Sequence, residues 1–395
     1  MAGEPQALEG LRIIDFSRVL AGPLATMVLG DLGADVVKVE HPDGGDDTRT
    51  WGPPFAMGTS TYFLGLNRNK RSITLDLSGA DDLEVARNLC LRADVVVDNF
   101  RSGTMSEWGL DFHALAEERP DIVTCSITGF GNATPHPKRA GYDLIVQAAS
   151  GIMSLTGPED GPPYKVGVAL LDKITGLYAA IAILSAIRHR DRTGDGQPIE
   201  ISLMEAALAS LLNSASSFIG TGMVPRRTGN RHPSIAPYQP FETQDGTIVV
   251  AAGSEKIWHT LCTVVDREDL KTDPRFITNE ARVEHVDDLE EQLTLAFRSD
   301  SSASWIKRLR ESGIPAGQIN DIAQAFDEAA ELNLNPIDTL VGEAGNEFRS
   351  VRSPMNLGVS PPSVRIRPPD LGEHDNEIRS ALLDEVMSEV RKKTL

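Results

Sequence analysis

Short apolar segments alternate with longer amphipathic ones along the first half of the chain. Strands are predicted at residues 11–16, 34–40, 72–76, 94–98 and 122–127, and helices at 21–32 and 79–92. Most of the predicted strands are rich in valine and isoleucine, which is typical of buried strands. Because parallel strands need a long crossover, usually a helix, this rhythm predicts an α/β fold with a parallel, doubly wound sheet.

The pattern changes after residue 167. Residues 175–184 form a helical run of small and apolar side chains, which allow a neighbouring helix to approach closely. A further strand at 197–202 leads into a helix at 204–218.

Two stretches rich in proline divide the rest of the chain. Residues 220–234 are rich in Gly, Pro and Arg, which is typical of a crossover loop or a domain boundary. A hairpin is expected within 242–252, around the turn at 244–246, and helices follow it. The second stretch, 360–369, precedes an amphipathic final helix at 373–393.

Composition and charge narrow the possible partners. The chain has 395 residues, 41% hydrophobic and 24% charged, which is ordinary for a globular protein. The formal net charge of −19 argues against nucleic acid or an anionic membrane as a partner, so a polyanionic ligand would need a locally basic patch. No run of about 18 apolar residues occurs, and the first residues lack the features of a signal peptide. We therefore expect a soluble, cytoplasmic protein.

Cysteine and histidine positions argue against a disulfide framework and a metal site. Cys90, Cys125 and Cys262 lie far apart and form no CxxC pair, which favours buried free thiols. The histidines show no HxxxH spacing, so no metal is expected. Neither GxGxxG nor GxSxG occurs, and the glycine turn at 129–131 is a weak signal by itself.

Asp172 is the first candidate for chemistry. It follows the apolar stretch 168–171 and immediately precedes the small-residue helix. A helix N-terminus offers unpaired backbone N–H groups and a partial positive charge, which would keep a carboxylate ionised and could cradle an oxyanion. The alternative is an N-cap aspartate without chemistry, and spacing alone favours this cap.

Three basic clusters are candidate phosphate sites, at residues 68–71, 138–139 and 226–231. They fall in loops or near strand ends, where open α/β sheets bind ligands. A solvated surface is the commoner role for such clusters, so they do not identify a ligand by themselves.

Ordered motifs across nearly the whole chain resemble the CaiB/BaiF family of CoA-transferases (family III). This family includes formyl-CoA transferase, other acyl-CoA:carboxylate CoA-transferases and α-methylacyl-CoA racemase. The motifs are LEGLRIIDF (8–16), AGP (21–23), LGADVVKVE (32–40), NKRS (69–72), DNFR (98–101), RAGYD (139–143), LDKITG (171–176), GNRHP (229–233) and LGEH (371–374). Their number and order argue against chance similarity.

The resemblance implies two linked domains and a dimer. Residues 1–224 would form a large, Rossmann-like, CoA-binding domain and 225–340 a smaller α+β domain, while 341–395 would return to the large domain. Chains of this family interlock in pairs, so an interlocked homodimer is also implied.

In this family the aspartate that matches Asp172 is the nucleophile, which reverses the preference for a cap. Its carboxylate would attack a thioester to give a mixed anhydride and then an aspartyl-CoA thioester, from which CoA passes to an acceptor acid. Coenzyme A and acyl-CoA would be substrates, with no tightly bound cofactor. Because anhydrides hydrolyse, water must be excluded, and we expect a pKa of Asp172 low enough to keep it ionised near neutral pH.

By resemblance, CoA should lie along the end of the sheet. The expected contacts are Leu20, Ala21, His41, Arg71, Leu75, Asn99, Phe100, Arg101, Lys138, Arg139 and Tyr142. Leu20, His41 and Ser78 replace residues of formyl-CoA transferase, so phosphate recognition is expected to move to the arginines and lysine of that set. The glycine-rich loop of the formyl-CoA site is missing, which disfavours formyl transfer.

Asp143, Arg231 and His232 are the expected residues for the acid substrate, with a dicarboxylate such as succinate as the acid. A structural role for residues 231–232 in bracing the loop is an equal alternative. Racemases of the family resemble a two-base design with a histidine where this chain has Tyr142, and tyrosine is a poor base at neutral pH. Transfer is therefore favoured over racemisation. A catalytically silent CoA-binding protein is the third alternative, because fold alone does not establish activity.

Overall fold

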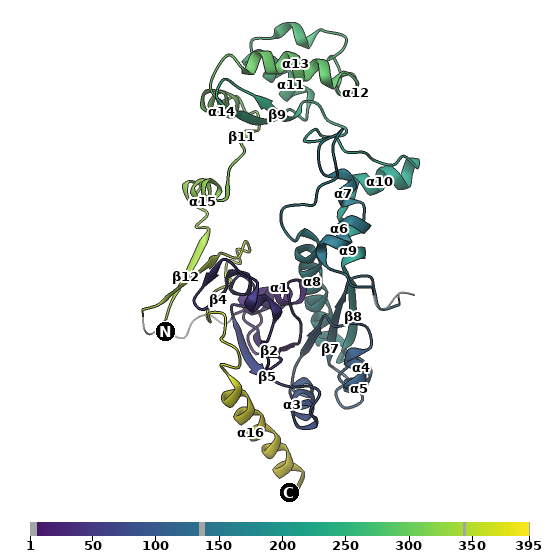
Figure 1. Ribbon diagram of the computed structural model, residues 1–395, viewed down its shortest axis with the longest axis vertical. Coiled ribbons are helices and arrows are strands. Elements are labelled where there is room, and N and C mark those ends of the chain that lie inside the picture. Colours follow the sequence, from purple (N-terminus) through teal and green to yellow (C-terminus); the bar gives the residue numbers. More distant parts are fainter. Residues whose placement is uncertain (1–5, 134–138, 343–344, 395) are drawn as a thin grey trace. The chain divides into compact units, whose positions relative to one another are not determined.

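The structure of the protein is a computed structural model that describes residues 6–133, 139–342 and 345–394 (Figure 1). The chain forms two compact units. The first contains Met1–Ile152, Val166–Thr221 and Asn335–Leu395, and the second contains Met153–Lys165 and Gly222–Leu334. The segment 153–165, which we assigned to the large domain from the sequence, packs with the second unit instead.

A six-stranded parallel sheet is the centre of the first unit, as predicted. In sheet order its strands are β5 (Lys70–Thr74), β2 (Asp35–Glu40), β1 (Arg12–Asp15), β6 (Val95–Asp98), β7 (Val123–Thr128) and β8 (Gln197–Ser202). Every neighbouring pair of these strands runs parallel. The strands coincide with the predicted segments to within two residues at each end.

Helices cover both faces of this sheet (Figure 1). One face carries α1 (Ala21–Asp31) and α8 (Leu170–Thr193), and the other carries α3 (Ala80–Leu91) and α16 (Asp375–Thr394). Because successive residues of a strand point to opposite faces, Ile13 is buried under α1 and α8, whereas Ile14 is buried under α3 and α16. This two-sided burial explains the continuous apolar strands of the sequence.

The strand order reverses direction between β1 and β6. The chain moves outward through β2 and β5 on one side of β1, and through β7 and β8 on the other side of β6. At such a switch point the loops after the two central strands leave in opposite directions and open a crevice, which is where doubly wound sheets bind their ligands. The loops that follow β1 and β6 are therefore the first place to look for a site.

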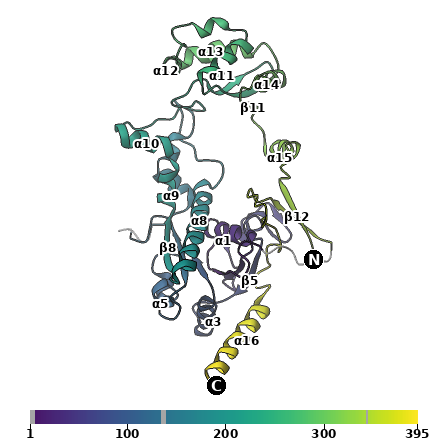
Figure 2. The ribbon, with the colours of Figure 1, turned by 180° about the vertical axis from the view of Figure 1, so that it is seen from behind.

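The helices α1 and α8 lie side by side (Figure 2). A Cβ atom at Gly176 of α8 would lie 2.5 Å from the carbonyl oxygen of Ala21, so only glycine permits this approach. The expected close packing of the small-residue helix is confirmed. Among the described residues, α8 is also long and apolar enough to span a membrane, but residues such as Ala179 and Ile183 are buried in the first unit.

Smaller elements complete the first unit. They are η1 (Asp47–Thr50), β3 (Phe55–Ala56), β4 (Thr59–Ser60), α2 (Thr61–Leu64), α4 (Thr104–Glu107), α5 (Phe112–Ala116), α6 (Asp143–Ala149), α7 (Ile152–Leu155, which crosses into the second unit), α9 (Leu203–Ser210), α10 (Leu212–Thr221), β12 (Ile337–Val341) and β13 (Glu347–Val351). The single helix predicted at 204–218 is wrong, because the chain breaks between α9 and α10, where Leu212 has a φ of +45°.

The second unit has an antiparallel sheet and its own apolar core. Its elements are β9 (Tyr238–Glu242), β10 (Thr247–Ala251), α11 (Glu255–Val264), η2 (Glu268–Lys271), α12 (Asn279–Glu284), α13 (Val286–Phe297), α14 (Ser302–Glu311), β11 (Ala316–Gln318) and α15 (Ile322–Glu331). The predicted hairpin is confirmed in β9 and β10. Trp258, Phe276 and Phe297 are fully buried in the core of this unit.

Candidate active site

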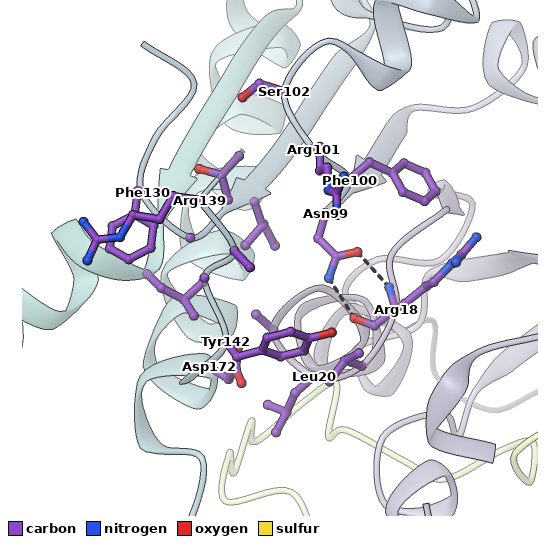
Figure 3. A pocket seen from close by; sticks show the side chains of 18 of the residues that line it. Arg18, Leu20, Asn99, Phe100, Arg101, Ser102, Phe130, Arg139, Tyr142 and Asp172 are labelled. Carbon is purple, nitrogen blue, oxygen red and sulfur yellow. Dashed lines mark hydrogen bonds between the residues drawn. The ribbon is translucent and has the colours of Figure 1, made fainter. Parts of the chain in front are cut away.

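A pocket of about 390 Å³ opens at the carboxyl ends of β1, β6 and β7, at the switch point of the sheet (Figure 3). Its lining comprises Arg18, Val19, Leu20, Ala21, Asp47, Asn99, Phe100, Arg101, Ser102, Ile127, Thr128, Gly129, Phe130, Gly131, Arg139, Ala140, Gly141, Tyr142, Asp172 and Leu203. Three arginines against two aspartates make this pocket locally basic within a strongly acidic chain. The pocket can therefore attract an anionic ligand despite the net charge.

Asp172 enters this pocket from the first turn of α8. The N-cap of α8 is Ala169, which provides no side-chain cap. The carboxylate of Asp143 takes that role from a separate helix, because its Oδ1 accepts the backbone N–H groups of Leu171 (2.8 Å) and Asp172 (3.2 Å). Asp172 is thus not the cap of its own helix, and its carboxylate is left to face the pocket.

Gln147 holds the Asp143 carboxylate in place. Its fully buried side chain donates a hydrogen bond to Oδ2 of Asp143 and accepts the backbone N–H of Val166 at 2.9 Å. Gln147 and Asp143 lie one turn apart on α6, so the two side chains lie on the same face of the helix. Through these two side chains, α6 holds the backbone at Val166, shortly before α8, and the first turn of α8 itself.

Burial raises the pKa of Asp172 to about 7, and the negative charge of Asp143 adds to the effect. We expected a carboxylate that stays ionised at neutral pH, and this expectation is wrong for the free protein. Burial is the main reason, and the backbone N–H groups at the start of α8 do not offset it, because Asp143 rather than Asp172 accepts them. An aspartic acid with this pKa is only partly ionised near pH 7.

The loop after β1 forms the opposite wall of the pocket. The Asn99 side chain accepts the backbone N–H of Arg18 at 2.9 Å and donates to the Arg18 carbonyl at 2.7 Å (Figure 3). The next residue, Val19, has a φ of +68°, in the left-handed region that β-branched residues rarely adopt. Asn99 thus ties the loops of the two central strands together across the switch point.

A second pocket of about 260 Å³ continues along the same edge of the sheet. It is lined by Phe16, Arg18, Val39, Glu40, His41, Leu75, Asp76, Leu77, Ser78, Phe100 and Trp108. Arg18 and Phe100 line both pockets, and the Arg18 guanidinium lies 5.3 Å from the Phe100 ring centroid. A long ligand could therefore run from one pocket into the other past this pair.

Comparison with known proteins supplies the family. Residues 8–375 match the profile described as CoA-transferase family III. The chain belongs to this family. It is accordingly a CoA-transferase, an enzyme whose substrates are thioesters of coenzyme A.

Named relatives agree with this CoA-transferase assignment over almost the whole chain. Succinyl-CoA:glutarate CoA-transferase of Mus musculus is 40% identical in an alignment of 393 positions that covers 96% of this chain and 89% of the relative. Acetyl-CoA:oxalate CoA-transferase of Acetobacter aceti is 37% identical over 372 residues, or 94% of each chain. The crystal structure of a CaiB/BaiF family protein from Brucella suis has a TM-score of 0.85 at 40% identity, covering 96% of this chain and 100% of the other.

Most of the predicted site residues of the CoA-transferase gather in the two pockets. Leu20, Ala21, Asn99, Phe100, Arg101, Arg139, Tyr142 and Asp172 line the larger one, and His41 and Leu75 line the smaller one. In Figure 3 the Tyr142 ring extends over the pocket, and Arg139 is drawn with Phe130 away from Arg18 and Asn99. The guanidinium of Arg139 lies 3.8 Å from the Phe130 ring centroid, a cation–π contact.

Arg71 is not in either pocket, so its assignment to the CoA contacts is corrected. It lies near the start of β5, whereas the pockets lie beyond the carboxyl ends of the strands. Its guanidinium pairs with Asp35 at 2.7 Å and Glu377 at 2.8 Å, and these contacts raise its pKa. The assignment of Lys138 cannot be placed, because this residue lies outside the described part of the chain.

Arg231 and His232 belong to the second unit of the CoA-transferase. The Arg231 guanidinium pairs with Asp287 at 2.7 Å and also with Glu290. The His232 ring lies 5.4 Å from that of Tyr238 and accepts the backbone N–H of Ser234. These contacts support the structural alternative, in which the two residues brace the loop, because both carboxylates neutralise the charge that a substrate acid would need.

Several lining residues of the CoA-transferase pocket escaped the sequence analysis. Arg18 is one, since a lone arginine after a strand carries no signal by itself. Gly129 and Gly141 are two more. The backbones of these two glycines approach each other so closely that a Cβ on either would lie within 2.3 Å of the other's Cα. The turn at 129–131 was the available signal for this approach. It was weak because the partner, Gly141, comes twelve residues later in the chain.

Proposed function

We propose that the protein transfers coenzyme A from an acyl-CoA to a free carboxylic acid through covalent intermediates on Asp172. The observation that carries the proposal is the position of Asp172. Its carboxylate faces a basic pocket at the ligand-binding edge of the sheet and is relieved of the capping role by Asp143. A carboxylate with no structural task in such a pocket is suited to nucleophilic catalysis.

The reaction proceeds by exchange of carboxylate and thiolate at carbonyl carbons. Asp172 attacks the thioester carbonyl, and the C–S bond breaks to give a mixed anhydride and CoA thiolate. The thiolate then attacks the Asp172 carbonyl and expels the donor acid, leaving an aspartyl-CoA thioester. The acceptor carboxylate repeats these two steps in reverse order, so the product acyl-CoA leaves and the Asp172 carboxylate is regenerated.

The raised pKa of Asp172 has a chemical use in this scheme. A carboxylate that is poorly stabilised by hydrogen bonds and partly desolvated is a stronger nucleophile than one in water. Transient negative charge on the attacked oxygen must be met by donors, and we infer that the backbone N–H groups at the start of α1 supply them. Leu20 and Ala21 line the same pocket, and helix geometry leaves these first N–H groups without intrahelical acceptors.

Coenzyme A in this proposal runs along the carboxyl edge of the sheet. The adenosine lies in the smaller pocket near His41 and Leu75, and the pantetheine arm passes Phe100 into the larger pocket toward Asp172. Arg18 and Arg139 are the cations available for the phosphates. Arg101, in the loop after β6, is the third cation of the larger pocket. Guanidinium groups suit this role because they stay charged and bind phosphate oxygens in pairs.

A dicarboxylic acid is the proposed acyl group or acceptor. Each relative reported above is named for at least one dicarboxylate, succinyl and glutarate in one and oxalate, beside acetyl, in the other. We therefore expect succinyl-CoA as donor and glutarate as acceptor to be the first pair to test.

Trapping with hydroxylamine tests the role of Asp172. The protein is incubated with succinyl-CoA and hydroxylamine, digested, and analysed by mass spectrometry. We expect a hydroxamate on Asp172, produced only with acyl-CoA present, and none in the Asp172→Asn variant. Transfer to glutarate without any label at Asp172 would contradict the covalent scheme. Exchange of an α-proton in deuterated buffer without acyl transfer would instead indicate the racemase alternative.

We further propose that two chains interlock as a homodimer. Large apolar side chains are exposed on α8 and α10, including Leu177 (41%), Ile181 (59%) and Ile219 (81%). Exposed apolar surface of this kind is typical of an interface between chains. Light scattering after gel filtration should give twice 42.7 kDa down to nanomolar concentration, and a monomer at micromolar concentration would contradict the proposal.

A further inference from the structure

A buried ion pair lies directly behind the wall of the larger pocket. The Lys38 ammonium and the Asp46 carboxylate are 2.9 Å apart, and both side chains are completely buried. Lys38 lies on β2, and Asp46 precedes η1, so the chain brings the two charges together from separate elements. A buried ion pair adds little net stability, because the loss of hydration offsets the attraction between the charges.

This ion pair binds the backbone of the loop after β1. The Lys38 ammonium donates to the Ser17 carbonyl at 2.8 Å, and the Asp46 carboxylate accepts the Val19 N–H, with both oxygens at 3.3 Å. Between these two contacts, the Asn99 side chain holds the N–H and carbonyl of Arg18. Three consecutive residues of the loop are thus held through their backbones by three side chains.

The conformation that these contacts hold is an unfavourable one. Val19 has a φ of +68°, where its branched Cβ meets the backbone, and such residues persist only where their surroundings impose them. The Asp46 carboxylate is the acceptor of the Val19 N–H in this conformation. Asp46 is in turn oriented by its contacts with Thr48 and Lys38.

The loop and Asp172 are linked through α1. Leu20 and Ala21 follow Val19 directly, and the Ala21 carbonyl is the atom that approaches Gly176, one turn after Asp172 on α8. A displacement of Val19 therefore moves the pocket wall that faces Asp172. Because reacting groups must be held within a fraction of an ångström, a small displacement would slow the reaction.

We propose that the Lys38–Asp46 pair is a positioning pair for CoA transfer, which holds Val19 in its strained conformation and thereby sets the Leu20–Ala21 wall against Asp172. The pair touches no substrate; it acts through the loop backbone. The inference rests on the proposed function in taking Asp172 as the reacting group. It assigns a task to two buried charges that the binding of CoA does not use.

The pair should affect the rate of transfer more than the binding of acyl-CoA. Most of the CoA surface would lie against the smaller pocket and Phe100. The pair meets that pocket through the Asp46 backbone N–H, which donates to Glu40 at 3.0 Å and which a change of side chain leaves in place. Only the wall near Asp172 depends on Val19. We therefore expect a lower kcat and a nearly unchanged KM when the pair is removed.

The test removes both charges together, so that neither is left buried without its partner. The variant is Lys38→Met/Asp46→Leu, in which residue 46 can no longer accept the Val19 N–H. The matched control is Arg68→Met/Asp31→Leu, which removes the ion pair at the other end of α1; its two side chains are 7% and 3% exposed and 2.7 Å apart. Both variants lose a buried pair next to the same helix, and only one pair contacts the pocket loop.

Steady-state transfer from succinyl-CoA to glutarate and the melting temperature are measured for both variants. We expect kcat to fall about tenfold or more for Lys38→Met/Asp46→Leu, with KM for succinyl-CoA within about twofold of the parent protein. The control should keep its kcat within about twofold at a comparable change in melting temperature. An equal kcat for the two variants would overturn the proposal.

A single substitution keeps the test decisive if the double variant does not fold. Asp46→Asn preserves the size of the side chain and removes only its charge, while Lys38 keeps its hydrogen bond to the Ser17 carbonyl and its attraction to Asp15 and Glu40. We expect a kcat about threefold lower; a kcat equal to that of the parent protein would overturn the proposal. Hydroxylamine labelling of the parent protein separates the two claims. Absence of a label at Asp172 would refute the covalent scheme, whereas the comparison of kcat values still reports on the ion pair.

Discussion

The substitution Asp172→Asn should stabilise the folded protein, and the gain should grow with pH. Burial and Asp143 raise the pKa of Asp172 from its reference value of 3.8 to about 7. Between these two values the folded protein binds more protons at this site than the unfolded chain does. The free energy of unfolding of the parent protein therefore falls as the pH rises through this range. Asparagine has no proton to lose, so the variant escapes this loss.

The size of the effect follows from the same pKa. The contribution of Asp172 to the free energy of unfolding falls between pH 5 and the folded-state pKa of about 7, a range of about two pH units. At 1.36 kcal/mol per unit, this corresponds to about 2.7 kcal/mol. Because the side chain is partly exposed, solvent screening roughly halves this figure, to about 1.4 kcal/mol. At about 2 °C per kcal/mol, the melting temperature should differ by about 3 °C more at pH 8 than at pH 5.

The assay compares melting temperatures of the parent protein and Asp172→Asn at pH 5 and pH 8 in the same ionic strength. Asp195→Asn serves as control, since Asp195 is an exposed carboxylate on the turn after α8. We expect the control to follow the parent protein at both pH values. A gain for Asp172→Asn that is equal at the two pH values, or a loss at pH 8, would refute the argument that this carboxylate is strained by its surroundings.

Three further predictions concern the same pocket. Removing the negative charge with Asp143→Asn should lower the pKa of Asp172, so the midpoint of the pH dependence of kcat/KM should move from about 7 to about 6, and an unchanged midpoint would contradict the charge effect. Gly176→Ala should destabilise the protein by about 2 kcal/mol in urea unfolding, because its Cβ meets the Ala21 carbonyl, whereas Gly220→Ala on α10 has open space and should not destabilise it. Arg139→Ala should raise KM for acyl-CoA about tenfold and make KM less sensitive to salt, because a screened attraction to phosphate is lost. Arg71→Ala, which breaks the pairs with Asp35 and Glu377, should leave KM unchanged, and equal KM values for the two variants would refute the phosphate assignment.

The order and type of the main elements could be read from the sequence because the signals are local. Alternating apolar segments predicted the six strands of the parallel sheet but not the short strands β3 and β4, and the turn at 244–246 predicted the hairpin of the second unit. The run of small residues in α8 predicted a close helix contact, which Gly176 makes with Ala21. Ordered motifs also identified the family, since they preserve residue types at fixed positions in the chain.

The properties of Asp172 were decided by the tertiary structure. Its position before a helix predicted a cap with an ordinary pKa, but Asp143 reaches the same N–H groups from α6 and leaves Asp172 to the pocket. Arg71 shows the same limit, because its place in a basic motif does not reveal that Asp35 and Glu377 neutralise it. The Lys38–Asp46 pair gave no signal in the sequence at all. Charge interactions and pKa values depend on distance and burial, and both are fixed only when separate elements pack together.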